Sequence, residues 1–586
     1  MYRGLPPEYL TINKDRLRSC MLPGENVLAV QVHNSNITSS DISSNVFLSF
    51  GITDTVHNYR PVPLWFNAPI DFKSSNLPVI VITTDPAETI PDEPKINADM
   101  KIIYHGGTTR NLVSDPGNVY SGTIGIEIRG RYSASFPRKP FGFETRDSSG
   151  NNLNTGLLGM PPENDWILLA NYNDKTFLRN YLAFEISREM GHYAPLSRYC
   201  EVVLNGLYQG IYLLTEKIKV DENRVNIAKL RPDENSGENM SGGHIFKIDY
   251  YTPSDSWMSN YSPIEKPDAQ MFFVYYDPEP DELTVYQKNY LKDYVNTFET
   301  VLYSPGFADH QTGFRAYIDV PSFIDYFLVG EVSRNVDTYK KSRYLYKNRD
   351  SRNGLIVSGP VWDFDWAWKN LTEDCINFNQ IDGSGWAYKI NDCFAWPVPP
   401  SWEVRLLQDK EFKNEIHDKY FILRKSVLSE GHLNHPIDSV ALLLDEAKER
   451  HYQQWPILGI NVGTPEPDEQ PTTYTGEIEK IKKWIMTRLT WLDKNMVGKS
   501  AVYFDFYKAL CRIFPNPAQD YLNIESDTII DKVILYTASG VKVKDASGFY
   551  DYSVNINLTD LGPGFYLVSI FFSDGEIMTR RIIKIR

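Results

Sequence analysis

The residues best suited to chemistry lie in Gly359–Trp368, which reads GPVWDFDWAW. Aromatic side chains alternate there with Asp363, Asp365 and Ala367. If the stretch is extended, its period of two puts the aromatic side chains on one face and both carboxylates on the other. Neighbouring carboxylates repel each other unless a cation neutralises them, and oxygen ligands suit Mg²⁺ or Ca²⁺. The motif therefore predicts a strand with a divalent metal site, although a capping Asp and a solvated Asp would give the same letters.

The composition indicates several domains and excludes some partners. With 586 residues the chain is too long for one core, so about three or four domains are expected. The net charge of −15 argues against non-specific binding of nucleic acid or of anionic membranes. No apolar run reaches about 18 residues, so no transmembrane segment is expected. The opening MYRGLPPEYL lacks the pattern of a signal peptide.

The cysteines suggest an oxidising compartment. Of five cysteines, Cys375 and Cys393 flank the loop-rich segment CINFNQIDGSGWAYKINDC. Their spacing predicts a disulfide that closes this loop, and two buried thiols are the alternative. The odd number leaves at least one cysteine unpaired, and no CxxC or Cys/His cluster indicates zinc.

The first residues resemble the end of a β-domain. LPGENVLAVQVHN alternates apolar and polar residues like a strand, and it is similar to the end of galactose-binding-like jelly-roll modules in large secreted bacterial proteins. We expect residues 1–52 to be a partial β-sandwich and residues 53–75 to be a linker. An N-terminally truncated gene product would also explain the missing signal peptide.

Residues 76–500 mix strands with helices. LPVIVITT and Thr123–Arg131 read as strands, and the turn Asn205-Gly206 predicts a hairpin between two apolar strands. Asp174 predicts the N-cap of a helix over about Thr176–Met190. Apolar residues at helical spacing predict further helices toward the end of this region.

Four motifs follow one another in this region. RNYLA lies on the predicted helix, NGLYQGIYLLTE on the hairpin, EVSRNVD before YLY, and WDFD after it. In this order they resemble the CotH family of atypical kinases, named after bacterial spore-coat proteins. The resemblance implies an α+β, two-lobed domain distantly related to protein kinases. It also implies transfer of phosphate from ATP to Ser or Thr hydroxyls of a protein.

The resemblance implies a role for each acidic residue. Phosphoryl transfer needs a positioned hydroxyl and neutralised phosphate charge. Asp337 would be the catalytic group that accepts the hydrogen bond of the acceptor hydroxyl, and Asp363 would bind Mg²⁺ or Mn²⁺. Asp365 would be a second metal ligand, and Asn335 would orient the loop or reach the metal. The alternative for Asp337 is an ordinary turn residue.

Three residues are candidates for binding ATP. Lys139 precedes a strand and is the candidate for a phosphate contact, with a solvated lysine beside Pro140 as the alternative. Arg179 would anchor phosphate near a helix start, and Glu216 would lie near the nucleotide. These two could instead form a structural ion pair. The Gly-rich loop, His-Arg-Asp and Asp-Phe-Gly motifs of ordinary kinases are missing, and Asp-Phe-Asp replaces the last.

The pattern changes abruptly near Ser500. Alternating strands with glycine turns in residues 505–586 predict a small antiparallel β-sandwich. The segments PNP, SGVKV and LGPGFY closely resemble the C-terminal sorting domain of the type IX secretion system of Bacteroidetes-like bacteria. The resemblance implies export through the outer membrane, to the medium or the cell surface, with the secretion machinery as partner. A generic carbohydrate- or protein-binding sandwich is the alternative.

Three classes of function remain open. The first is an exported, metal-dependent protein kinase that uses ATP. The second is a surface adhesin or scaffold that keeps the fold without catalysis, which the scarcity of ATP outside cells favours. The third is a metal-dependent hydrolase that uses Asp363 and Asp365.

Overall fold

The chain divides into two units between residues 499 and 500. The computed structural model describes residues 70–85, 88–107, 109–372, 375–499, 511–537, 540–573 and 577–585. The predicted sandwich remnant (1–52) and most of the predicted linker (53–75) therefore lie outside the described residues. Within these ranges, no helix has the length and apolar character needed to cross a bilayer.

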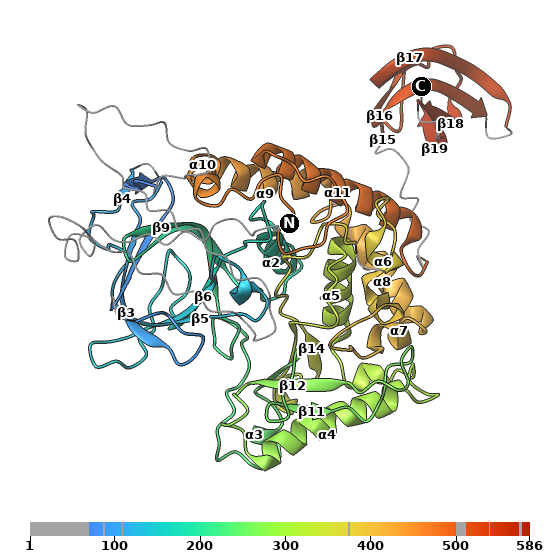
Figure 1. Cartoon of the computed structure of the whole chain (residues 1–586). Coiled ribbons are helices and arrows are strands. Elements are labelled where there is room, and N and C mark those ends of the chain that lie inside the picture. The colour runs from blue at the N-terminus through green and yellow to red at the C-terminus, as the bar shows by residue number, and fades with distance from the viewer. Residues whose placement is uncertain are drawn as a thin grey trace, which may run out of the picture. The chain divides into compact units, whose positions relative to one another are not determined.

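The first unit begins with a closed β-barrel (Figure 1). Its strands are β2 (Val79–Thr84), β3 (Ile96–Ile103), β5 (Tyr120–Ile128), β6 (Phe141–Thr145), β7 (Asp165–Leu169), β8 (Ser197–Leu204) and β9 (Leu207–Glu216). They lie in the order β2-β3-β5-β6-β7-β9-β8, and a parallel pairing of β8 with β2 closes the barrel. The strands β1 (Ser74–Ser75) and β4 (Asn111–Leu112) pair into a separate two-stranded sheet.

The barrel strands follow from the sequence patterns. Alternate apolar side chains, such as Ile126, Phe143 and Trp166, fill one continuous core. The predicted hairpin is confirmed as β8 and β9, and its turn residues Asn205 and Gly206 have φ values of 51° and 78°. Two positive φ values are typical of the tight turns that match the twist of paired strands.

A five-stranded sheet follows, in the order β11-β12-β10-β13-β14. Its strands are β10 (His244–Ile248), β11 (Ser256–Met258), β12 (Phe272–Asp277), β13 (Arg343–Lys347) and β14 (Ile356–Ser358). The α-helices of this unit are α2 (Arg179–Glu189), α3 (Gly237–Met240), α4 (Val285–Leu302), α5 (Val320–Ser333), α6 (Ile376–Asn379), α7 (Trp402–Leu406), α8 (Lys410–Leu423), α9 (Glu430–Leu443), α10 (Asp445–Gln454) and α11 (Tyr474–Asn495). Short 3-10 turns are η1 (Ser133–Ser135), η2 (Phe314–Ala316), η3 (Asp350–Arg352) and η4 (Ala387–Asp392).

Helix α5 is the central element of this part. It packs against α2, α8, α11 and β14, and every residue from Ser322 to Ser333 is buried. Asp319 caps its start by accepting the N–H of Ser322 at 3.0 Å, and the helix ends where Arg334 adopts a φ of 44°. A helix that is buried all round belongs to a protein core. The loop that follows α5 therefore starts from a fixed base.

Two local predictions differ from the structure. Gly359–Trp368 is not a strand, because β14 ends at Ser358 and Asp363 turns the chain with a φ of 65°. Helix α2 begins at Arg179 rather than Thr176. The reason is that the Asp174 carboxylate accepts the N–H groups of both residues, at 2.9 and 3.1 Å, in a turn before the helix.

The second unit consists of strands in the residues described. These are β15 (Cys511–Phe514), β16 (Tyr521–Thr537), β17 (Lys542–Asn557), β18 (Gly564–Phe572) and β19 (Ile577–Lys584). The long strand β16 pairs with β15 over its first residues and with β18 over its last, so the sheet folds around its own core. The predicted antiparallel β-domain is present, but its strands pair into one continuous sheet rather than two separate sheets.

Candidate active site

The Asp-Phe-Asp segment after β14 is held between two helices. From α2, Asn180 accepts the N–H of Phe364 at 2.7 Å, and Arg179 donates from Nε to the carbonyl of Ala367 at 2.8 Å. From the other side, Trp368 donates its N–H to the last residue of α5 at 2.9 Å. The side chains of Phe364 and Trp368 are buried. The aromatic residues of the motif thus anchor the segment, although not by the predicted strand geometry.

The loop after α5 reaches the same segment. Asn335 donates from Nδ2 to the backbone carbonyl of Asp363 at 3.3 Å. Its Oδ1 accepts the N–H of Asp337 at 3.3 Å. The buried amide side chain of Asn335 therefore joins Asp337 to the Asp-Phe-Asp segment. With these two hydrogen bonds, Asn335 orients the loop.

Three of the predicted acids influence one another through their charges. The pKa of Asp363 lies well above its ordinary value, first because the carboxylate is desolvated and then because Asp365 and Asp337 are near. Burial also raises the pKa of Asp365, and Asp337 adds to the rise, although Asn173 donates to Asp365 Oδ2 at 2.7 Å. A bound cation relieves repulsion of this kind.

The acids differ in how well their charges are balanced. The Nζ atoms of Lys340 and Lys341 lie 3.3 and 3.4 Å from Asp337 Oδ1. The carboxylate of Asp363 instead accepts the Ser342 hydroxyl at 3.3 Å, and it forms no ion pair with any residue that the structure describes. Of these two acids, Asp363 is therefore the one whose charge lacks an ionic partner among the described residues.

Of the predicted ATP-binding residues, Lys139 and Glu216 have their contacts apart from this cluster, and Arg179 contacts the Asp-Phe-Asp segment through the Ala367 carbonyl. Lys139 donates from Nζ to a backbone carbonyl five residues earlier, at 2.8 Å. Glu216 is buried and pairs with Arg224 at 3.3 Å. Arg179 is buried and pairs with Asp174. An ion pair between Arg179 and Glu216, the structural alternative, is therefore wrong, because each has another partner.

The structure adds residues that the sequence reasoning missed. Asp249, just after β10, contributes to the raised pKa of Asp363. Arg129, just after β5, lies with its guanidinium 5.4 Å from the centre of the Trp362 ring, and both its charge and that of Asp363 act on Tyr344. Arg129 has no ion pair within the described part of the chain. The sequence signal for Asp249 and Arg129 was a charged residue directly after a strand, in KID (Lys247–Asp249) and IRGR (Ile128–Arg131).

The acids do not form a complete metal cage. Among the described residues, no group of three or more His, Cys, Asp and Glu side chains is arranged to hold a metal ion. Asp363 and Asp365 remain as two desolvated carboxylates within one segment. Mg²⁺ is typically held by one or two carboxylates together with substrate phosphates and water. The donor set thus fits an ion that arrives with a nucleotide.

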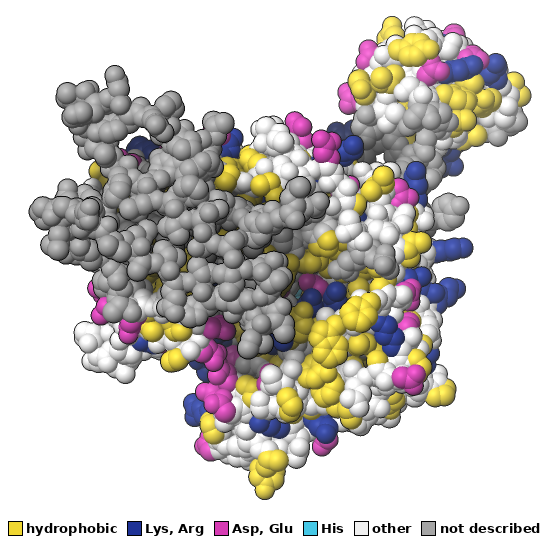
Figure 2. Space-filling model, in the orientation of Figure 1, with side chains coloured by type: hydrophobic (Ala, Val, Ile, Leu, Met, Phe, Trp, Pro, Cys, Tyr) yellow, Lys and Arg dark blue, Asp and Glu magenta, His cyan; other side chains and the backbone are white. Residues whose placement is uncertain are grey.

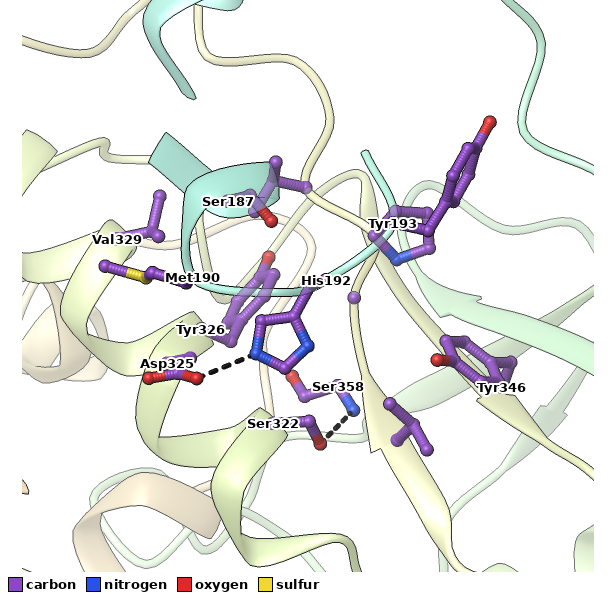
Figure 3. Close-up of a pocket in the computed structure, with 14 residues that line it drawn as sticks. Ser187, Met190, His192, Tyr193, Ser322, Asp325, Tyr326, Val329, Tyr346 and Ser358 are labelled. Atoms are coloured by element: carbon purple, nitrogen blue, oxygen red, sulfur yellow. Dashed lines mark hydrogen bonds and ion pairs between the residues drawn. The ribbon is translucent and has the colours of Figure 1, made fainter. Parts of the chain in front are cut away.

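A separate pocket lies where the end of α2 meets α5, and Gly359, Pro360 and Val361 line part of it (Figure 3). His192 Nε2 lies 2.8 Å from Asp325 Oδ2, and Ser358 donates its N–H to Ser322 Oγ at 3.0 Å. The pocket is not lined by Asp337, Asp363 or Asp365. Its contacts fix β14 against α5, directly before the Asp-Phe-Asp segment.

Comparison with known proteins agrees with the arrangement of motifs. The family described as CotH kinase protein matches residues 126–492, and the family described as secretion system C-terminal sorting domain matches residues 512–584. Inner spore coat protein H of Bacillus subtilis (strain 168) is 26% identical over 201 residues, which are 34% of this chain and 49% of that protein. The chain spans about half the length of this curated relative. The sorting domain supports a secreted or cell-surface location.

Proposed function

Because the chain belongs to the CotH kinase protein family, we propose that it transfers the γ-phosphoryl group of ATP to a Ser or Thr hydroxyl of an exported protein. The observation that carries this proposal is that Asn335 joins the loop of Asp337 to the segment of Asp363 and Asp365 by two hydrogen bonds, where burial and the nearby Asp365 and Asp337 also raise the pKa of Asp363. A kinase needs this separation of roles, with one acid for the nucleophile and others for metal.

Asp337 is the residue we place at the acceptor hydroxyl. Its carboxylate accepts a hydrogen bond from the hydroxyl and orients the oxygen toward the phosphorus. Lys340 and Lys341 hold the carboxylate from one side, at 3.3 and 3.4 Å, and Asn335 fixes its backbone. Positioning of this kind lowers the entropy cost of bringing two reactants together.

Asp363 and Asp365 are the residues we assign to a divalent metal, with Mg²⁺ or Mn²⁺ as the ion. Such an ion, when bound, neutralises phosphate charge and orients the transferred group. The raised pKa values of both carboxylates support the assignment, since a cation offsets the cost of their burial. Asn335 bonds the Asp363 carbonyl, so its role is to hold the segment that bears the ligands.

For the phosphate contact, Arg129 is a better candidate than Lys139. Arg129 lies over Trp362, next to Asp363, and has no carboxylate partner in the described chain. Lys139 donates to a nearby carbonyl instead. We therefore propose that Arg129→Ala weakens ATP binding more than Lys139→Ala does, as measured by calorimetry.

The arrangement also supports a division of the first unit into two lobes. The barrel supplies Arg129, and the part centred on α5 supplies Asp337 and the Asp-Phe-Asp segment. We propose that nucleotide binds between these parts, as in kinases. Arg179 and Glu216 then act as internal anchors, because their partners are buried protein groups.

The test compares substitutions of two acids, which should have different effects on phosphate transfer and on ATP binding. Purified protein is incubated with labelled ATP and Mg²⁺ or Mn²⁺, and phosphate transfer and ATP affinity are measured for each variant. Asp337→Asn should lower transfer by roughly 10² to 10³ while ATP binding survives. Asp363→Asn should lower transfer and also weaken metal-dependent ATP binding. Asp233→Asn, at an exposed site, is the matched control.

A second candidate is an adhesin or scaffold that retains the fold. The contacts of Lys139 and Glu216 favour it, because neither candidate nucleotide residue faces the acids. Wild-type protein that binds no nucleotide in the presence of either metal would favour this function. Release of phosphate to water without protein transfer would favour the metal-dependent hydrolase.

A further inference from the structure

An aromatic ridge borders the loop of Asp337. We define the ridge as Tyr251, Phe272, Phe394 and Trp396. The Tyr251 and Phe272 rings stack with centres 4.0 Å apart, and the Trp396 ring lies 5.9 Å from that of Tyr251. Phe394 is 90% exposed and Trp396 is 53% exposed. Hydrophobic side chains gather on this face of the molecule, between α5, α7 and β12 (Figure 2). Contiguous exposed aromatic residues mark interaction sites more often than ordinary surface.

One lysine connects the ridge to Asp337, and a second lysine contacts the segment that bears Phe394. Lys341 lies 3.4 Å from the Asp337 carboxylate, and its Nζ is 5.1 Å from the ring centre of Tyr250, the residue before Tyr251. At the other end, Lys266 donates to the carbonyl of the residue before Phe394 at 2.5 Å. The ridge therefore begins directly beside the lysine that holds the catalytic carboxylate.

The segment that carries the exposed rings is firmly held. Cys393, directly before Phe394, is bonded to Cys375. Asn391 donates to the carbonyl of Pro399 at 3.0 Å, which joins the two ends of the segment. A surface that is ordered before binding loses little entropy when a partner docks. The exposure of Phe394 is thus a property of a constrained loop.

We propose that the aromatic ridge is the docking surface for the acceptor polypeptide, which places an aromatic or large aliphatic side chain against Phe394 and Trp396 while its Ser or Thr reaches Asp337. This rests on the proposed kinase function. When the acceptor hydroxyl lies at Asp337, the residues that flank it in the acceptor chain reach the ridge. Another exposed apolar pair, Val285 and Tyr286, lies on α4 instead. Aromatic anchors supply much of the affinity in such interfaces.

The test uses short fluorescein-labelled peptides with a central serine in an alanine background. One position at a time carries Phe, Leu or Ala, and binding to the full chain is followed by fluorescence polarisation with Mg²⁺ and a non-hydrolysable ATP analogue. At one or more positions, Phe or Leu should bind about tenfold tighter than Ala. Phe394→Ser and Trp396→Ala should abolish this preference and leave ATP binding unchanged. Tyr286→Ala, at a residue 63% exposed on α4, should keep it.

The outcomes separate this proposal from the kinase function. Phosphate transfer with no apolar preference, or with a preference that survives in both ridge variants, would overturn the ridge alone. Apolar preference at the ridge without any transfer would overturn the kinase function and leave the ridge as a peptide-binding surface. Concentration-dependent dimers that Phe394→Ser dissolves would assign the ridge to a second copy of the chain and overturn docking of the acceptor.

Discussion

At the scale of single residues, the carboxylate of Asp363 lowers the stability of the folded protein. Its carboxylate is desolvated and is repelled by Asp365 and Asp337, while its described partner is one hydroxyl. Asp337 sits in the same cluster but has Lys340 and Lys341 as partners. Neutralising each acid should therefore change the free energy of unfolding in opposite directions.

We expect Asp363→Asn to stabilise the metal-free protein at neutral pH. Because burial and the nearby Asp365 raise its pKa, ionisation of Asp363 costs free energy in the folded protein, so the free energy of unfolding should rise when the charge is removed. Asp337→Asn should destabilise by about 1 to 3 kcal/mol, because it leaves the buried ammonium of Lys340 and the half-buried ammonium of Lys341 without their carboxylate. Urea unfolding with a chelator present measures both changes. Destabilisation by Asp363→Asn would show that its charge is compensated in solution.

At the scale of elements, the segment from Cys375 to Cys393, which we call the clasp, contacts the end of α5. The disulfide, predicted from the spacing, is present. Inside the segment, Glu331 of α5 accepts the N–H groups of Ala387 and Tyr388, both at 2.8 Å. Arg334, just after α5, donates to a carbonyl of the same segment. The clasp therefore supports the helix end from which the Asp337 loop departs.

Reduction of the Cys375–Cys393 disulfide should loosen the loop that carries Asp337. Closing a loop of this size is worth about 3 kcal/mol, so Cys375→Ser with Cys393→Ser should lower the unfolding free energy by that order. Phosphate transfer should fall more than ATP binding, because the loss is in the position of Asp337. Dithiothreitol should reproduce both effects in the wild type and add nothing in the double variant. A reductant effect that persists in the double variant would place the sensitivity elsewhere.

The same clasp gives stability a defined pH dependence. Burial raises the pKa of Glu331 from 4.5 to about 7, although Arg488 lies 3.2 Å away. Because the folded value is the higher one, the contribution is complete below about pH 4.5 and is lost as the pH rises through 7. The unfolding free energy should fall by about 3 kcal/mol across this window. Glu331→Gln should flatten this part of the curve in urea titrations, and an equal slope in the variant would refute the assignment.

The sequence predicted elements better than it predicted the site. Strong local patterns, such as the Asn205-Gly206 turn and the apolar strands, determine pairing through short-range geometry. The strand prediction for the Asp-Phe-Asp segment was wrong because its conformation depends on hydrogen bonds to the distant residues Asn180 and Arg179. The alternation of aromatic and acidic residues in the segment does not determine it. Arg129 and Asp249 were missed for the same reason, since they become relevant only when the barrel and the α5 region fold together.

At the scale of the whole molecule, the two units are built on separate cores. The first depends on the barrel interior and on α5, and the second on a sheet whose buried residues, such as Leu535 and Ile570, all come from residues 511–585. The sorting family matches residues 512–584. A domain with its own core folds without its neighbour. The sorting-domain match therefore lies in the C-terminal unit, and the catalysis that we propose belongs to the first unit.

We expect removal of residues 505–586 to block export but to leave the rest folded. In a bacterium with a type IX secretion system, the truncated chain should stay inside the cell while the full chain reaches the surface or the medium. In vitro, calorimetry of the full chain should show two transitions, because each unit has its own core, and truncation should remove one without shifting the other. Phosphate transfer per molecule should not change. Loss of the remaining transition, or of nucleotide binding in the truncated chain, would show that the C-terminal unit stabilises the first unit rather than only directing it.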